Sequence, residues 1–432
     1  MNRTFFWLII PVVIVLSQIS CTSQDAKISE SHVARVIKTL SSDSLKGRHA
    51  FSPEIKEAAK IISSEFEKIG LSYLPGEDDF LQEFTIHTIL PESTAVMLNG
   101  EIIEPKHYFG VLNGETIHWK TGDVQVEAIS QDEDFRKEFR KLTDDEQSAL
   151  VLISKNHKNW FHRYRNWFAS RNRTFKLNQG PSDIFIFSNA TANRFEIYFQ
   201  NEVSATELAN VIGVLEGKRK DEVVIFSGHY DHIGIAAPTG RDSIANGAND
   251  NASGVAAIIE LARYYSQLPK QERSLYFTAF TAEENGGLGS KYFSERINPE
   301  EIIAMINMEM IGKPSSEGPN SAWITGFELS DLGSILQSSQ TDSSFTFYPD
   351  PYPAQNLFYR SDNASLARLG VPAHTISTTP IDLDRDYHTV SDEFHTINIE
   401  HVSKTIDAIA KSCKPIIRGT KTPSRINPDS LR

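Results

Sequence analysis

Residues 223–232 read Val-Val-Ile-Phe-Ser-Gly-His-Tyr-Asp-His, an apolar run that passes directly into chemically reactive side chains. Short, nearly continuous apolar runs also lie at 275–280, 303–310 and 371–376. Such runs are typical of strands buried on both faces of a parallel sheet. Apolar side chains at helical spacing separate the first two runs. We therefore predict an α/β domain over 204–418, with a mixed, mainly parallel sheet in three layers flanked by helices.

The composition is that of a globular protein and narrows the classes of partner. The 432 residues are 40% hydrophobic and 23% charged, enough chain for one large domain with an insertion. The formal net charge of −13 argues against nucleic acid, because phosphates attract basic surfaces. Cys21 and Cys413 are the only cysteines, which excludes a disulfide framework and a cysteine-based metal site. Cys413 continues an apolar helical line and is expected in the core.

The first 21 residues have the layout of an export signal. A Met-Asn-Arg start precedes an apolar run over 5–16 and a small-residue exit to Cys21, and the run is too short for a membrane span. Cys21 occupies the place of a lipidated cysteine, although Gln18 fits such a signal poorly. We expect an exported protein of a Gram-negative bacterium, periplasmic or on the outer membrane, held to the membrane only by a lipid on Cys21. Cleavage to a free periplasmic protein is the alternative.

The rest of the chain divides by composition into four parts. Residues 26–90 contain a good amphipathic helix that needs a partner surface, so we predict a helical lead-in that packs on the α/β domain. Short β-type runs between polar stretches predict a smaller, inserted β-rich domain over 91–203. The α/β domain over 204–418 follows, and 419–432 is a polar tail.

Residues 160–173 interleave aromatic and basic side chains. This pattern can mark a platform for single-stranded nucleic acid. Trp160, Tyr164, Trp167 and Phe168 share one helical face, however, so packing explains the aromatic residues without a ligand. We favour packing, because the protein is acidic and carries an export signal.

Acidic or imidazole side chains follow each predicted strand, or lie in a loop next to one. Ligands of parallel sheets collect at the carboxyl ends of strands, so these side chains are expected to meet. Imidazole and carboxylate without thiolate are the ligands of hydrolytic zinc, and one bridging carboxylate suits a two-metal site. Carboxylates crowded together without cations would oppose each other's ionisation. The residues are His229, Asp231, Asp250, Glu283, Glu284, Glu309 and His388.

Four motifs occur in one order: His-x-Asp at 229–231, Asn-Asp-Asn-Ala-Ser-Gly at 249–254, Glu-Glu at 283–284 and Tyr-His-Thr at 387–389. They resemble those of the zinc-dependent exopeptidases, which include bacterial leucyl aminopeptidases, glutamate carboxypeptidases of the prostate membrane type and glutaminyl cyclases. The resemblance covers the catalytic domain well and extends into the lead-in. It implies a phosphorylase/hydrolase-like zinc peptidase fold, and it places the inserted domain where many members carry a protease-associated domain.

The resemblance also implies two Zn²⁺ per chain and a division of labour among the residues. His229 and Glu309 would bind one ion, Glu284 and His388 the other, and Asp250 would bridge them. Glu283 would be the general base, taking a proton from the attacking water and passing it to the leaving amine.

Further expectations concern the surroundings of the ligands. By resemblance, Asp231 would fix the imidazole tautomer of His229, and the Asp250–Asn251 peptide bond would be cis. Glu309 stands where aminopeptidases of the family usually have Asp. Asn363 replaces a common His, and we expect its amide to donate to the substrate or to an oxyanion.

The leading hypothesis is a zinc-dependent exopeptidase acting on a peptide or small protein. Aminopeptidase activity is favoured by its frequency in the family, and carboxypeptidase activity stays open. One alternative is a glutaminyl cyclase-like acyltransferase, and another is an inactive peptide-binding surface lipoprotein. The intact Glu283–Glu284 pair argues against the inactive form. The sequence predicts neither the substrate nor the oligomeric state.

Overall fold

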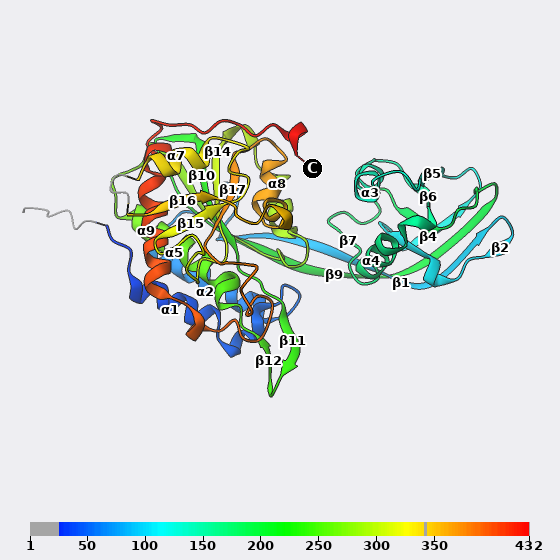
Figure 1. The fold of residues 1–432 in the computed structure, drawn as a ribbon, viewed down its shortest axis with the longest axis horizontal. Helices are drawn as coiled ribbons and strands as arrows, with labels where there is room; N and C mark the ends of the chain where they lie inside the picture. Colours follow the sequence, from blue (N-terminus) through cyan, green and yellow to red (C-terminus); the bar gives the residue numbers. More distant parts are fainter. Residues whose placement is uncertain (1–25, 341–343, 432) are drawn as a thin grey trace, which may run out of the picture.

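The computed structural model describes residues 26–340 and 344–431 (Figure 1). The predicted lipidation site Cys21 lies outside these residues. None of the helices within them combines the length and the apolar character that crossing a bilayer requires. A large α/β body and a smaller inserted domain are joined by two long strands (Figure 1).

Within the described residues, an eleven-stranded mixed sheet forms the centre of the molecule. Nine of its strands follow in the order β16-β15-β17-β14-β10-β13-β9-β1-β2, while β4 pairs with β9 and β7 pairs with β1. Neighbours from β17 to β13 run parallel, whereas β9 and β15 pair antiparallel with this central block. This arrangement confirms the predicted α/β class. The strands are β1 (Leu81–Leu98), β2 (Glu101–Ile102), β4 (Thr116–Lys120), β7 (Arg173–Thr174), β9 (Phe195–Leu215), β10 (Arg219–His229), β13 (Arg273–Phe280), β14 (Ile302–Met308), β15 (Ser321–Ile324), β16 (Thr346–Pro349) and β17 (Ala373–Ser377).

Helices cover both faces of this sheet and complete the three layers. One hydrophobic cluster joins α1, α2, α5 and α9 to the sheet, and it includes the buried Cys413. A second cluster lies under α6 and α8. The helices are α1 (Glu30–Leu40), α2 (Glu54–Ile69), α3 (Phe135–Thr143), α4 (Lys158–Phe168), α5 (Ser253–Ser266), α6 (Leu288–Ser294), α7 (Leu332–Ser338), α8 (Asn363–Ala367), α9 (Ile399–Ser412) and α10 (Lys414–Ile417).

The boundaries predicted for the inserted domain fall inside continuous strands. β1 and β9 pair antiparallel from Leu81 opposite Val211 to Leu98 opposite Phe195. The register shifts only next to Pro91, which has no N–H to give to the ladder. The two domains are therefore joined by a hydrogen-bonded ribbon, not by linkers at 91 and 203. The amino-acid composition of a strand follows its burial, and burial changes where β1 and β9 leave the catalytic domain. The two strands stay paired across that point, so a change in composition cannot reveal the ribbon.

The inserted domain has a four-stranded sheet of its own, in the order β3-β8-β6-β5, packed against α3 and α4. Its strands are β3 (Tyr108–Val111), β5 (Gln125–Ile129), β6 (Ala149–Ile153) and β8 (Asp183–Phe187). The packing interpretation holds for the aromatic residues Trp160, Tyr164 and Phe168, which contact Phe135 or Phe139. Trp167 differs from them, because its side chain is 45% exposed. The expected similarity to a protease-associated domain stays a prediction.

The polar tail is part of the fold. Ile426 is buried in the second hydrophobic cluster, and the Arg425 guanidinium donates to the backbone carbonyls of Pro299 and Ile302. A short antiparallel hairpin, β11 (Gly234–Thr239) and β12 (Asp242–Ala245), projects from the catalytic domain (Figure 1).

Asp183 gives the inserted domain a pH-dependent stability. It is buried, it accepts the N–H of Ala149, and burial raises its pKa from 3.8 to about 7. A folded-state pKa above the unfolded value means that folding takes up a proton, so stability is lost as pH rises from 3.8 to about 7. We expect Asp183→Asn to raise the free energy of unfolding at pH 8 by about 2–4 kcal/mol, at about 1.4 kcal/mol per pKa unit.

Urea unfolding of this variant between pH 4 and pH 8 checks the prediction. The advantage over the wild type should shrink toward pH 4, and the exposed Asp132→Asn should show none. An advantage that does not depend on pH would contradict the titration of Asp183.

Candidate metal centre

Three adjacent strands deliver four of the predicted residues to one edge of the central sheet. β14, β10 and β13 are neighbours in the sheet. β10 ends in His229, β13 is followed by Glu283 and Glu284, and β14 is followed by Glu309. Because parallel strands present their carboxyl ends at the same edge, short extensions of these strands bring the side chains together.

The Asp250 carboxylate lies between the two predicted histidines. Its Oδ1 is 3.2 Å from His229 Nε2, and its Oδ2 is 3.2 Å from His388 Nε2. His388 Nε2 is also 3.0 Å from Glu284 Oε1. Ligand atoms of His229, Asp250 and Glu309 lie within 4.8 Å of one another, as do those of the group around Glu284. The structure thus brings all five predicted ligands together, around a carboxylate shared by two groups.

A third histidine joins the second group and was missed in the sequence. His232 Nδ1 is 3.2 Å from Glu284 Oε1 and 3.8 Å from Asp250 Oδ2. Its ring is buried and lies edge-on to that of His388. The available signal was its position in the same strand-end segment as His229.

The site has the properties of a cation site. His229 Nε2, Asp250 Oδ1 and Glu309 Oε2 are buried and form no hydrogen bond to the described residues. Buried polar atoms normally have partners, so unpaired atoms that converge indicate a ligand. The donor set is imidazole and carboxylate, which suits zinc.

The pKa values of Glu309 and His388 also indicate that the site lacks positive charge. Burial, with the nearby Asp250 and Glu284 carboxylates, raises the pKa of Glu309 to about 7. Burial opposes protonation of His388, yet Asp250 and Glu284 raise its pKa to about 10. Divalent cations would remove this mutual repulsion.

Glu283 belongs to neither ligand group. Burial, together with the Glu309 and Glu284 carboxylates, raises its pKa well above the usual range. Its backbone N–H donates to Asp231 Oδ1 over 3.0 Å, and that of Glu284 donates to Asp231 Oδ2 over 3.3 Å. One carboxylate therefore orients both glutamates.

The expected contact between Asp231 and His229 takes a different form. His229 Nδ1 is 3.1 Å from the backbone carbonyl oxygen of Asp231 and 3.7 Å from its carboxylate. The carbonyl is the closer acceptor and fixes the tautomer, while the carboxylate is engaged by the glutamate backbone. Burial raises the pKa of Asp231 to about 6.

Asp392 supports the shared carboxylate from behind and was not predicted. Its two oxygens accept the N–H groups of Asn249 and Asp250 over 2.8 and 2.9 Å. The Asp250–Asn251 bond is cis, as the resemblance implied. A single acidic residue in a polar loop carries no sequence signal for this role.

Arg48 connects the lead-in to the site. Its guanidinium is fully buried and donates to four backbone carbonyls, those of Leu40, Tyr230, Asn246 and Gly247. The last three lie in the loops that carry His229 and Asp250. The lead-in therefore holds the loops of the metal centre in place.

The prediction for Asn363 is contradicted. Its amide is buried and donates to the carbonyls of Phe358 and Ala373, and its oxygen accepts from the Thr375 hydroxyl. Both amide hydrogens are used within the fold, so Asn363 has none to offer a substrate. It joins α8 to β17 instead.

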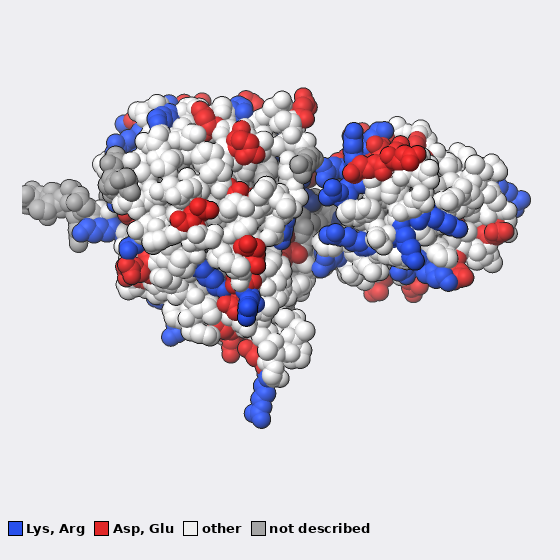
Figure 2. Space-filling model, in the orientation of Figure 1, with Lys and Arg blue, Asp and Glu red and all other residues white. Residues whose placement is uncertain are grey.

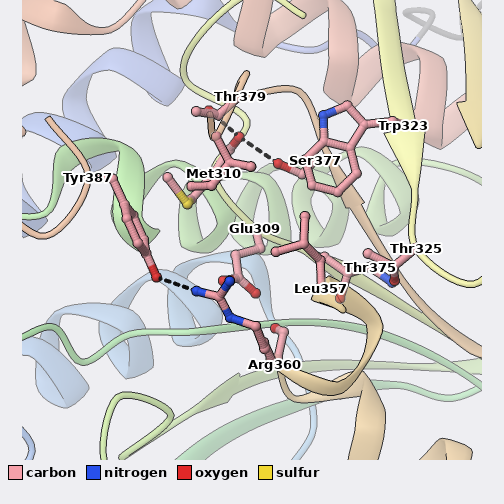
Figure 3. Close-up of a pocket in the computed structure, with 12 residues that line it drawn as sticks. Glu309, Met310, Trp323, Thr325, Leu357, Arg360, Thr375, Ser377, Thr379 and Tyr387 are labelled. Atoms are coloured by element: carbon pink, nitrogen blue, oxygen red, sulfur yellow. Dashed lines mark hydrogen bonds between the residues drawn. The ribbon is translucent and has the colours of Figure 1, made fainter. Parts of the chain in front are cut away.

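A pocket opens beside Glu309 (Figure 3). Its walls combine apolar side chains, including Met310, Trp323 and Leu357, with hydroxyl groups. At its rim, the Arg360 guanidinium donates to the Tyr387 hydroxyl over 3.3 Å. The Tyr387 ring stacks on His388 with centroids 4.0 Å apart.

An α/β sheet with histidines and glutamates gathered around a shared aspartate at one edge is typical of the class of α/β metallohydrolases. Comparison with known proteins gives the family. Residues 210–413 match the model of peptidase family M28. The chain is therefore similar to that family over the part that carries the metal centre.

Individual relatives are distant. A probable zinc metalloprotease of Pyrenophora teres f. teres is 34% identical over 113 residues, 26% of this chain and 24% of the relative. Aminopeptidase YwaD of Bacillus subtilis is 23% identical, over 68% of this chain and 65% of the relative. The chain thus spans a quarter to two thirds of these relatives. The solved aminopeptidase from Aneurinibacillus sp. strain AM-1 shares the fold, with a TM-score of 0.55 at 19% identity, covering 95% of this chain and 98% of that one.

Proposed function

We propose that this protein is a zinc-dependent exopeptidase that removes residues from the amino terminus of peptides. One observation carries the proposal: the Asp250 carboxylate is shared by two ligand groups, with Glu283 buried beside them and bound by neither. Such a shared carboxylate is the arrangement that two-metal hydrolases require. The names of the aminopeptidase relatives favour the amino terminus over the carboxyl terminus.

The residues present suggest how the reaction is carried out. Zinc, when bound, supplies Lewis acidity that polarises the scissile carbonyl and activates water. Glu283 takes the proton of the attacking water on its carboxylate and delivers it to the leaving nitrogen. Asp231 fixes the backbone of the glutamate pair, so that Glu283 cannot turn away as its charge changes. The Tyr387 hydroxyl stands at the rim of the pocket, placed to donate to the developing oxyanion.

We further propose two zinc ions per chain. His229, Asp250 and Glu309 would hold one, and Asp250, Glu284 and His388, with His232 adjacent, would hold the other. Zinc added back to chelated protein should restore hydrolysis of leucine p-nitroanilide up to two equivalents, as measured by rate against bound zinc. Full activity at one equivalent, with formation of pyroglutamate from an amino-terminal glutamine peptide, would instead favour the glutaminyl cyclase alternative.

Terminal preference is tested directly with blocked peptides. We expect the zinc-loaded protein to cleave Leu-Ala-Ala and its carboxyl-terminal amide, and to leave N-acetyl-Leu-Ala-Ala intact. Cleavage of the acetylated peptide from its carboxyl end would assign a carboxypeptidase. Binding of all three peptides without cleavage would favour the alternative of an inactive, peptide-binding surface lipoprotein.

The location is part of the proposal. We propose export with a lipid on Cys21, so that Cys21→Ser should release the protein from the membrane fraction into the periplasm.

A further inference from the structure

Trp167 of the inserted domain lines the same cavity as Glu283, Glu284 and His388. This cavity has a volume of about 450 Å³ and lies between the end of α4 and the catalytic domain. Among the Trp, Tyr and Phe side chains of α4, Trp167 is the exposed one, whereas the others are buried or half-buried. An indole that is 45% exposed and lines the same cavity as Glu283 can form a wall for a ligand.

Neighbouring contacts hold this wall in place. The Arg171 guanidinium lies over the Trp167 ring, 4.0 Å from its centroid. Two residues further on, Arg173 lies over Phe51 of the lead-in at 4.3 Å, and Phe175 packs on Tyr292 with centroids 5.7 Å apart. The segment after α4 therefore docks on the body of the molecule, and the position of Trp167 over the cleft is fixed by these contacts.

The cleft is basic in an acidic protein. Lys291, Arg360 and Arg368 line it. Among the residues that the structure describes, neither Lys291 nor Arg368 forms an ion pair with an acidic side chain, although the Asp144 carboxylate lies near enough to favour the charge of both. The Lys and Arg side chains visible in Figure 2 gather on the side of the inserted domain that faces the catalytic domain. The acidic residues that line the cavity, Glu283 and Glu284, already have roles in the metal centre.

Two cavities meet at the metal centre, and they differ in kind. The pocket beside Glu309 is small, and it shares Arg360, Ser361 and Tyr387 with the larger cleft. A terminal side chain fits the small pocket, and the remainder of the peptide must then run into the cleft. Unpaired cations there attract a carboxylate and repel an amine, so the end of the peptide in the cleft is the carboxyl end.

We propose that this cleft is the subsite for the part of the substrate beyond the scissile bond, and that it selects short peptides with a carboxylate on that side. Trp167 supplies the flat wall, and Lys291 and Arg368 bind the carboxylate. The carboxylate is that of the peptide terminus or of an acidic side chain. The inference rests on the proposed function, since it assigns a direction and a substrate class to the same site.

The test compares peptides that differ only in this carboxylate. Zinc-loaded full-length protein is assayed with Leu-Ala-Ala, Leu-Ala-Ala amide and Leu-Ala-Glu amide, each as kcat/KM relative to leucine p-nitroanilide, which has no residue beyond the scissile bond. We expect a preference of about tenfold for the free acid over the amide, the effect of one charge-assisted contact. Recovery of the preference by Leu-Ala-Glu amide shows that a side-chain carboxylate also serves, whereas no recovery restricts the subsite to the terminal carboxylate.

Variants separate the subsite from general damage. Lys291→Gln combined with Arg368→Gln should abolish the preference for the free acid, mainly through KM. Trp167→Ala should lower the relative kcat/KM of all three peptides, and Trp167→Phe should restore much of it. Lys220→Gln serves as the charge control, because this exposed lysine lies at the far end of β10 from His229.

A binding measurement distinguishes failure of the inference from failure of the proposed function. Zinc-loaded Glu283→Gln should bind Leu-Ala-Ala more tightly than its amide in calorimetry, and the double variant made in this background should not. If the wild type binds the free acid more tightly than the amide but cleaves neither, the subsite is supported and the proposed peptidase function is refuted. If the free acid and the amide are cleaved at equal rates, and the Lys291 and Arg368 changes have no effect, the subsite is refuted. The proposed peptidase function would then still stand.

Discussion

Replacing Glu283 by glutamine is expected to lower kcat roughly 10³- to 10⁴-fold without changing the amount of bound zinc. Glutamine keeps the size of the side chain and the backbone N–H bond to Asp231. It cannot accept a proton from water at neutral pH, and its carbonyl lacks the charge that makes the carboxylate a base. Since Glu283 belongs to neither ligand group, the loss should appear in kcat and not in bound metal.

The measurement is steady-state kinetics with leucine p-nitroanilide alongside zinc analysis of the same sample. Glu295→Gln is the matched control, because this glutamate is exposed at the end of α6 and should leave both quantities unchanged. A Glu283→Gln protein that retains zinc and works at the wild-type rate would rule out Glu283 as the base. Loss of one zinc would instead place Glu283 among the ligands.

The second large effect is expected for Arg48→Met. Methionine fills much of the space but donates no hydrogen bond, so four buried backbone carbonyls lose their partner. Burial lowers the pKa of Arg48 to about 10, which leaves it charged at neutral pH, and Asp392 and Asp250 lie close enough to favour that charge. We expect a loss of about 3–5 kcal/mol in the free energy of unfolding, the range for removing one partner of a buried charged network.

The effect on the metal centre should exceed a general loss of stability. The freed carbonyls of Tyr230, Asn246 and Gly247 flank His229 and Asp250, so we expect weaker zinc binding in conditions where the variant is still folded. Urea unfolding with and without zinc, together with competition against a chelator, measures both effects. Lys60→Met on α2 is the control, since its exposed ion pair with Glu57 should be worth less than about 1 kcal/mol. Equal losses of stability and of zinc affinity in the two variants would contradict the role of Arg48 in holding the loops of the metal centre.

Local features of the chain predicted much of the fold. The strands β10, β13, β14 and β17 were visible because burial on both faces requires an unbroken apolar run. Cys413 was expected in the core on the same ground, and it is buried. His229, Glu284 and Glu309 were visible because each follows a strand that ends at the same edge, whereas Asp250 and His388 lie in loops and were found by resemblance.

The errors occurred where pairing, rather than local sequence, decides the structure. The limits of the inserted domain were placed inside β1 and β9, because a ribbon pairs without regard to composition. Asn363 was assigned to the substrate although the fold uses both of its amide hydrogens. Asp392 and the four acceptors of Arg48 depend on backbone groups, which every residue carries and no sequence pattern marks.

The sequence by itself determined the chemistry available to this protein: histidines and carboxylates at strand ends, no thiolate, and one glutamate more than the two predicted zinc ions need. Ligand identity is a property of side chains, and strand ends can be located from hydrophobic runs. Only the tertiary structure decided that His232 joins one of the ligand groups and that Trp167 reaches the cleft from another domain. Such juxtapositions depend on how distant elements pair and pack, and one-dimensional spacing does not contain that information.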